Sequence, residues 1–339
     1  MKLLTITVPC FNSEQYMKKC IDSILAGGER VEIIIINDGS TDRTGLIADE
    51  YTHKYPDTIK VIHQINGGHG EGINQGIRHA SGTYFKVVDS DDWLGENELR
   101  TVLDRLEEVE QEGGIDMLVS NYVYEHNGKR KKRVIRYQNI FPANVVVRWK
   151  DTRRFFEHQY LTIHSVAYKT QMLRACGIEL PKHVFYEDNL FVYKPLPMVK
   201  KILYMDIDLY HYQIGREGQS VAEQALKKRY AHQLSIAKAI FVAHDLKTIR
   251  KEEPKLGRYM YHEAKMMLIM ATAFARLNKT DQAEIHIKRL WDEVTQHAPE
   301  MGKRIRYRSE AALINKPGSI GRSACIMFYK LAKKVVPFN

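Results

Sequence analysis

The stretch FKVVDSDDWL, residues 85–94, joins a run of apolar residues to three closely spaced carboxylates. The apolar part is typical of a buried strand, and Asp89, Asp91 and Asp92 follow it with only Ser90 among them. Like charges this close cost free energy unless a cation or hydrogen-bond donors compensate them. The stretch therefore predicts a strand that ends at a site for a positively charged group.

Strand and helix patterns alternate through roughly the first ninety residues. Strands are expected at 3–8, 31–38, 59–64 and 83–89, and helices from about Ser13, over 39–55 and over 70–80. Strands that alternate with helices imply parallel pairing with helices on both faces of the sheet. We therefore expect an α/β fold with a Rossmann-like, doubly wound sheet.

Polar residues follow these strands at the point where each strand ends. Asn12 and Glu14 come after the first, Asp38 ends the second, Asn66 and two glycines follow the third, and the DSDD stretch ends the fourth. Open α/β sheets bind their ligands at the carboxyl ends of their strands. The four groups are thus expected to form one site.

The pattern changes beyond residue 95. A helix over 96–113 is expected, followed by a hairpin around Asn127 and Gly128 that makes the sheet mixed. Periodic segments look helical throughout after about residue 220. We predict one α/β domain over 1–217, with a nucleotide-binding half at 1–95 and an acceptor-binding half at 96–217, and a helical region over 218–339.

The composition indicates a globular protein without a disulfide scaffold or a membrane span. The four cysteines have no paired spacing, no run of about 18 apolar residues occurs, and the first apolar residues look like a strand rather than a signal peptide, so we expect a cytoplasmic location. The net charge of +10 is concentrated over residues 301–339, which contain nine basic residues and one acidic residue. Aromatic and basic residues do not interleave as in nucleic-acid modules. Residues 318–339 either form a basic helix on an anionic membrane surface or pack against the helical region.

Two chemical interpretations compete for the acidic residues. An acidic turn is often only a solvated loop, but carboxylates that hold Mg²⁺ beside substrate phosphates fit the same pattern. Asp38 is either a turn residue or an acceptor of hydrogen bonds from a ribose or a nucleobase. The occurrence of both features together favours a metal and nucleotide site.

Four segments in this order resemble family 2 glycosyltransferases of the GT-A fold. They are VPCFNSEQYMKKCIDSIL (8–25), EIIIINDGSTDRT (32–44), NGGHGEGINQGIRHASGTYFKVVDSDDWL (66–94) and FYEDNLF (185–191). The resemblance is strong over about 1–95 and weaker to about 220. It implies an inverting transfer from a nucleotide-sugar donor, most often a UDP-sugar, with Mn²⁺ or Mg²⁺.

The resemblance also assigns residues to the donor. Asp89 and Asp91 match the family's DxD motif, with Asp91 the stronger metal ligand and Asp89 nearer the ribose. Asp38 would contact uracil or ribose. The other residues expected to border the nucleotide-sugar are Pro9, Phe11, Glu14, Asn66, Gly67, Gly68 and Ser90.

On the acceptor side, Asp188 matches the aspartate that serves these enzymes as general base. Inversion needs one carboxylate to take the proton of the acceptor hydroxyl. Without the other motifs, Glu187 and Asp188 would be read as an acidic helix start. This chain departs from the family at Ile73, where many members have an arginine, and His69 or another basic residue is expected to substitute.

Three further residues have two interpretations each. His211 is either a strand histidine or a contact to the metal or diphosphate, and His164 either faces the acceptor or belongs to the core. Arg216 is either a charge clamp over the diphosphate or a loop arginine.

A saccharide or lipid-linked acceptor, as in bacterial polysaccharide or teichoic acid assembly, is consistent with a basic tail at a membrane, and a homo-oligomer is left open. A nucleotidyltransferase, a glycosidase and a catalytically silent UDP-binding scaffold are the alternatives. This chain lacks the loop that a nucleotidyltransferase usually has after strand one. A glycosidase would leave the nucleotide motifs unexplained, and the intact acidic motifs argue against a silent scaffold.

Overall fold

The computed structural model describes residues 2–126, 132–215, 228–316 and 318–335. The described residues form two compact units, one of Met1–Arg154 with Leu161–Ile214 and one of Phe155–Tyr160 with Gly215–Asn339. The border predicted near Glu217 falls outside the described residues, and the split of the first unit at residue 95 stays a prediction.

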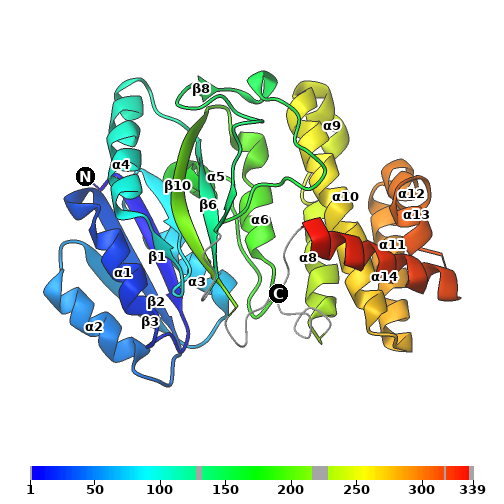
Figure 1. Ribbon diagram of the computed structural model, residues 1–339, viewed down its shortest axis with the longest axis horizontal. Helices are drawn as coiled ribbons and strands as arrows, with labels where there is room; N and C mark the ends of the chain where they lie inside the picture. Colours follow the sequence, from blue (N-terminus) through cyan, green and yellow to red (C-terminus); the bar gives the residue numbers. More distant parts are fainter. Residues whose placement is uncertain (1, 127–131, 216–227, 317, 336–339) are drawn as a thin grey trace. The chain divides into compact units, whose positions relative to one another are not determined.

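A mixed sheet forms the centre of the first unit (Figure 1). Its strand order is β3-β2-β1-β4-β9-β6-β10-β5, with β7 on β6 and β8 on β10. The strands are β1 (Leu4–Cys10), β2 (Val31–Asp38), β3 (Ile59–Gln64), β4 (Tyr84–Val87), β5 (Trp93–Leu94), β6 (Met117–His126), β7 (Arg133–Ile135), β8 (Val146–Val147), β9 (Val166–Lys169) and β10 (Ile202–Ile214).

The pairing confirms the expected fold class. β1 pairs in parallel with β2 and β4, and β2 with β3, as alternating strands and helices require. β9 is antiparallel to β4 and β6, so the sheet becomes mixed beyond residue 95 as expected. β6 and β7 pair in antiparallel fashion on both sides of the expected hairpin, whose turn residues lie outside the described part.

Helices cover both faces of this sheet. Helices α1, α2 and α4 lie in front of it in Figure 1, and α3 and α5 lie behind it. The helical segments of this unit are α1 (Met17–Leu25), η1 (Gly28–Arg30), α2 (Thr44–Lys54), α3 (His69–His79), α4 (Glu96–Gln111), η2 (Trp149–Asp151), α5 (Thr170–Ala175), α6 (Asp188–Tyr193) and η3 (Leu196–Met198). Every residue of β1 and β2 is buried, as expected for central parallel strands covered on both sides.

One close contact fixes α3 against β1. A Cβ placed on Gly76 would lie 2.6 Å from the Cβ of Thr7, so only glycine allows this approach. The beginning of α3 therefore has a fixed position at the carboxyl end of the sheet.

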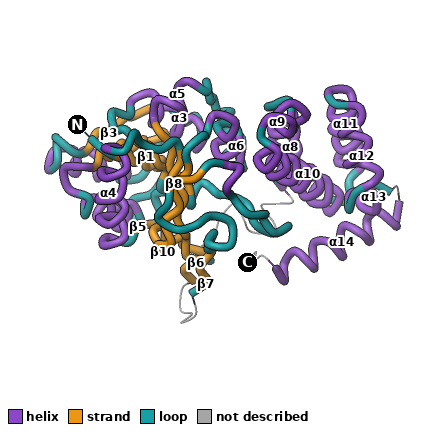
Figure 2. Tube along the Cα trace, turned by 90° about the horizontal axis from the view of Figure 1, so that it is seen from above, coloured by secondary structure: helices purple, strands orange, loops and turns teal. Residues whose placement is uncertain are grey.

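The second unit is helical, as predicted (Figure 2). Its helices are α8 (Tyr230–Val242), α9 (Leu246–Glu252), α10 (Pro254–Leu277), α11 (Asp281–His297), α12 (Pro299–Arg308), α13 (Ala311–Ile314) and α14 (Gly318–Val335). The segment Phe155–Tyr160 belongs to this unit: the ring of Phe155 stacks on Tyr259 at 4.1 Å. No helix within the described ranges is both long and apolar enough to cross a membrane.

Candidate active site

The loops that follow β1, β2 and β4 hold one another by hydrogen bonds. The N–H of Thr41 donates to Oδ1 of Asn12 at 2.9 Å, and the hydroxyls of Ser13 and Ser90 are 2.8 Å apart. Asn12 has φ = 50°, a left-handed conformation that asparagine tolerates better than most residues. The structure thus brings the polar ends of the first, second and fourth strands together, as the sequence suggested.

The residues expected to border the nucleotide differ in exposure. Pro9 is buried in β1, whereas the side chain of Phe11 is 54% exposed. Oε2 of Glu14 accepts a hydrogen bond from the N–H of Arg43 at 2.9 Å. Phe11 is therefore the aromatic surface that this loop offers to a ligand, and Glu14 also ties the loop to the start of α2.

Asp38 shapes the loop that leads into α3. Its buried carboxylate accepts hydrogen bonds from Nε2 of Gln64 at 2.6 Å and from the N–H groups of Gly67 and Gly68 at 2.7 and 2.9 Å. Nδ2 of Asn66 donates to its backbone carbonyl at 2.8 Å. Asp38 is thus a structural acceptor, a role that its position in the sequence did not reveal, and its contact with uracil or ribose stays a prediction.

Within the DSDD turn, Asp92 is the buried structural acid. The hydroxyl of Tyr210 donates to its Oδ2 at 2.5 Å, and the N–H of Gln213 donates to its Oδ1 at 2.8 Å. The same hydroxyl accepts from the N–H of Asp89 at 3.2 Å. Burial, and then the charges of Asp91 and Asp89, raise the pKa of Asp92 well above its usual range. Strand β10 therefore holds the turn in place through the hydroxyl of Tyr210 and the backbone N–H of Gln213.

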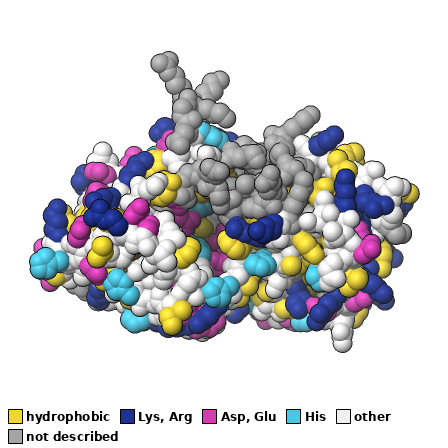
Figure 3. Space-filling model, turned by 90° about the horizontal axis from the view of Figure 1, so that it is seen from below, with side chains coloured by type: hydrophobic (Ala, Val, Ile, Leu, Met, Phe, Trp, Pro, Cys, Tyr) yellow, Lys and Arg dark blue, Asp and Glu magenta, His cyan; other side chains and the backbone are white. Residues whose placement is uncertain are grey.

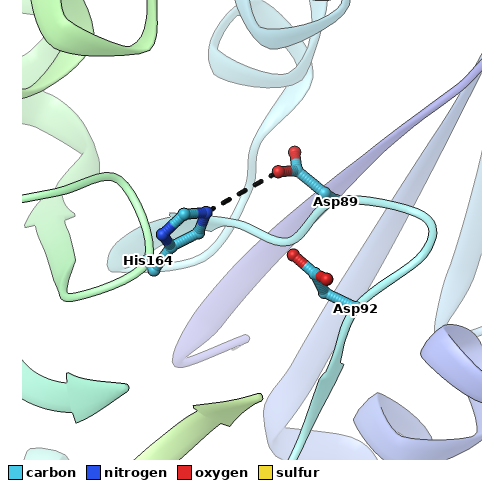
Figure 4. A group of neighbouring side chains, drawn as sticks. All are labelled: Asp89, Asp92 and His164. Atoms are coloured by element: carbon cyan, nitrogen blue, oxygen red, sulfur yellow. Dashed lines mark ion pairs between the residues drawn. The ribbon is translucent and has the colours of Figure 1, made fainter. Parts of the chain in front are cut away.

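Asp89 lies between two histidines. Its Oδ1 is 2.9 Å from Nε2 of His69, and its Oδ2 is 3.9 Å from Nε2 of His164 (Figure 4). Burial by itself raises the pKa of this carboxyl, but the two histidines outweigh it and hold the pKa far below its usual range. Asp89 is therefore ionised in the site.

His69 links this turn to the ED motif. Its Nδ1 is 2.8 Å from Oε1 of the buried Glu187, while its Nε2 faces Asp89. Because a carboxylate only accepts, both ring nitrogens donate and the imidazole is cationic. Burial disfavours that charge, but Asp89 and Glu187 outweigh burial and raise the pKa of His69 well above its usual value.

Asp188 is the first residue of α6 and follows Glu187 directly. Burial, and then the charge of Glu187, raise the pKa of its carboxyl to about 6, although His69 and His164 act in the opposite direction. A carboxylate with a pKa near the working pH is a better proton acceptor than an ordinary surface aspartate. The expected base thus lies in the same site as Asp89.

One group of side chains in the described part of the chain could hold a metal ion. Ligand atoms of Asp89, Asp92 and His164 lie within 4.8 Å of one another (Figure 4). His164 was not expected to be a ligand, because a lone histidine ahead of a strand gives no spacing signal. The assignment of metal ligands to Asp89 and Asp91 stays a prediction, with Asp91 half-buried in the same turn.

His211 is not brought to this group. Its ring stacks on Trp93 at 5.3 Å, and its Nδ1 lies 2.8 Å from Oε1 of Glu125. Tyr210 and Tyr212, which flank it in β10, instead place their rings 4.7 and 4.5 Å from His164. Successive strand side chains point to opposite faces, so His211 faces away from His164.

The remaining expectations concern charge near the donor. Ile73 is fully buried in α3, where the family motif would have its arginine. Arg216 lies outside the described residues. His69 is the basic residue whose ring nitrogen lies within hydrogen-bond distance of Asp89.

Comparison with known proteins establishes the family. The model of Glycosyl transferase family 2 matches residues 5–175, half of the chain. The chain therefore belongs to the family 2 glycosyltransferases, and it is an enzyme of the glycosyltransferase class.

Similar proteins come from bacteria. The chain is 28% identical over 315 residues to the uncharacterized glycosyltransferase EpsJ of Bacillus subtilis, and the alignment covers 88% of this chain and 87% of EpsJ. It is 24% identical over 282 residues to the minor teichoic acid biosynthesis protein GgaB of the same organism, and this alignment covers 78% of this chain but 29% of GgaB. The chain spans less than a third of the length of four of the curated relatives that it matches, GgaB included.

A solved structure shares the fold. Residues 1–349 of S. aureus TarS, in complex with UDP-GlcNAc, align over 97% of this chain and 92% of that chain, with a TM-score of 0.68 and 21% sequence identity. This likeness confirms a GT-A sheet followed by a helical region.

Tyr210→Phe tests whether β10 holds the DSDD turn. The change removes the donor to Asp92 and leaves a buried carboxyl short of one partner, which costs about 1–3 kcal/mol. We expect a lower free energy of unfolding in urea. Tyr212→Phe is the matched control, because its ring also contacts His164 but its hydroxyl does not bond to Asp92. Equal stability of the two variants would contradict this role.

Proposed function

We propose that this enzyme transfers a sugar, with inversion, from a UDP-sugar to an acceptor hydroxyl, with Asp188 as the general base. The observation that carries the proposal is that Asp89, on the donor side, and the Glu187–Asp188 pair are joined through one residue, His69, at hydrogen-bond distances of 2.9 and 2.8 Å. A single displacement needs a donor site and a base at this close range.

UDP-GlcNAc is the donor to test first, because TarS has been solved with that nucleotide-sugar on the same fold. In this chain the exposed ring of Phe11 would border the nucleobase, and the loop of Asn66, Gly67 and Gly68 would approach the donor with its backbone. Ser90, beside Asp89, would complete the donor side.

The acidic turn fits a divalent cation, Mn²⁺ or Mg²⁺. Nε2 of His164 and Oδ2 of Asp89 are 3.9 Å apart, too far for a hydrogen bond, and both are atoms of the kind that bind divalent cations. Asp89, Asp91 and His164 would hold the ion, while Asp92 already has two donors. A bound cation supplies positive charge to the leaving diphosphate.

On the acceptor side, Asp188 would take the proton from the attacking hydroxyl. Its pKa of about 6 leaves the carboxylate ionised at neutral pH and still basic enough to accept a proton. The oxygen then attacks the anomeric carbon from the face opposite the diphosphate, and UDP leaves with both electrons of the broken bond. His69 and the proposed cation site both adjoin the Asp89 carboxylate.

The acceptor is proposed to be a saccharide or lipid-linked precursor in bacterial cell-surface polysaccharide or teichoic acid synthesis. The likeness to EpsJ and to the minor teichoic acid protein GgaB supports this assignment. Such an acceptor would be met at the cytoplasmic face of a membrane. The proposal places the enzyme there as a peripheral protein.

Helix α14 offers a surface for anionic lipid. Ile320 and Met327 are 59% and 57% exposed and lie two helical turns apart, hence on one face, and Lys330, three residues after Met327, is exposed next to it. Figure 3 shows basic and apolar side chains side by side on the helical unit. Basic residues beside an exposed apolar face are typical of helices that lie on anionic membranes.

Metal-dependent UDP binding tests the donor site. Calorimetry should show binding of UDP that is stronger with Mn²⁺, and Asp91→Asn should weaken the metal-dependent part, because one ligand carboxylate is lost. Asp49→Asn, an exposed acid on α2, is the control. Absence of UDP binding in the wild type with Mn²⁺ would refute the proposed donor.

Asp188→Asn should abolish sugar transfer while UDP binding stays nearly intact, since the base does not hold the donor. In the wild type, kcat should fall about tenfold per pH unit below roughly pH 6, because protonation removes the base. UDP release from UDP-GlcNAc is the readout for both. Loss of UDP binding together with transfer would indicate a structural Asp188.

Membrane binding is tested by cosedimentation with vesicles. The double variant Ile320→Ser and Met327→Ser, and deletion of 318–339, should reduce binding to vesicles that contain phosphatidylglycerol, and the wild type should ignore vesicles of phosphatidylcholine alone. Leu46→Ser, which changes an exposed apolar residue on α2, is the control. Unchanged binding of the double variant would contradict the surface.

A further inference from the structure

His69 starts α3 at a point where the backbone has little freedom. Gly68 before it has φ = +84°, and a Cβ at that position would lie 2.9 Å from the backbone nitrogen of His183. The N–H of His183 in turn donates to the carbonyl of Gly67 at 3.0 Å. The Asp38 carboxylate holds both glycine N–H groups from the other side. The start of α3 is thus held from two directions.

Gly70, which follows His69, makes room for Glu187, the second hydrogen-bond partner of the histidine. A Cβ on Gly70 would lie 2.9 Å from Cγ of Glu187, so the glycine lets this side chain pass close to the helix. Glu187 is almost fully buried, with a side-chain exposure of 3%, whereas Asp89 is 27% exposed. His69 therefore connects a deep carboxylate to one that faces the site.

We infer that His69 is a positioning residue, which sets the place of the donor-side Asp89 and, through Glu187, of the base Asp188. It touches neither reacting atom in this assignment. It makes two hydrogen bonds from one rigid ring, so that the acidic turn after β4 and the start of α6 stay at a fixed distance from each other. The inference rests on the proposed function, in which these two acids serve the donor and the acceptor.

His69→Gln is the decisive variant, because the amide has nearly the size of the imidazole but is neutral and carries its donors on one nitrogen instead of two. We expect kcat for UDP release from UDP-GlcNAc to fall about tenfold or more, since small misplacements of reacting groups have effects of this size. The KM for UDP-GlcNAc should change less than kcat, because the histidine touches no donor atom in this assignment. His79→Gln, on the last turn of the same helix with a local bond to the Gln75 carbonyl, should match the wild type.

A double-mutant cycle separates positioning from simple stability. If His69 acts through Glu187, His69→Gln and Glu187→Gln should have non-additive effects on kcat and on the free energy of unfolding. Additive effects on kcat, or a rise in KM that accounts for the whole loss of activity, would overturn the inference. The inference would also be overturned if the kcat of His69→Gln equalled that of His79→Gln.

The two hypotheses fail in different ways. A wild type that neither binds UDP with Mn²⁺ nor releases it from UDP-GlcNAc would refute the proposed function. The unfolding cycle does not need activity, so additive stabilities in it would refute the link between His69 and Glu187 by themselves.

Discussion

The supply of hydrogen-bond donors to buried acidic groups at the carboxyl end of the sheet is the constraint on which the rest of the site depends. Asp89, Asp92 and Glu187 lie in a partly dehydrated region, where an acidic group without donors costs free energy. Their donors come from elements that are distant from them in the sequence. Tyr210 reaches Asp92 from β10, and His69 reaches Asp89 and Glu187 from α3.

This constraint explains why elements far apart in the sequence must meet here. The turn after β4 cannot bury Asp92 unless β10 lies beside it to supply a hydroxyl and an N–H. Glu187 cannot be buried without the histidine at the start of α3 and the glycine that admits it. The acidic turn after β4 and the Glu187–Asp188 pair are therefore parts of one hydrogen-bonded structure.

Asp38 shows the same principle at the second strand. Its carboxylate has three donors within the chain, two of them backbone N–H groups of the glycine loop. The loop owes its shape to this acid, and its shape determines where His69 begins α3. A residue that looks like a ligand contact in the sequence thus also stabilises the surface on which a ligand would lie.

The sequence by itself determined the parallel half of the sheet, because alternating apolar runs and helical spacings depend only on local periodicity. It also determined that the acids after β1, β2 and β4 share one edge, because the carboxyl ends of parallel strands meet there. The family followed from four ordered motifs, and the matched family model confirms it.

Only the tertiary structure decided which side chains meet. His211 was a candidate ligand on its sequence position, but the pleat of β10 turns it to Trp93 and Glu125, whereas its neighbours reach His164. His164 and Asp89 approach although 75 positions separate them in the sequence, and no local spacing signals that contact. The bridge from Asp89 through His69 to Glu187 likewise joins three segments, and its geometry follows from how helix α3 packs on the sheet, which periodicity alone does not specify.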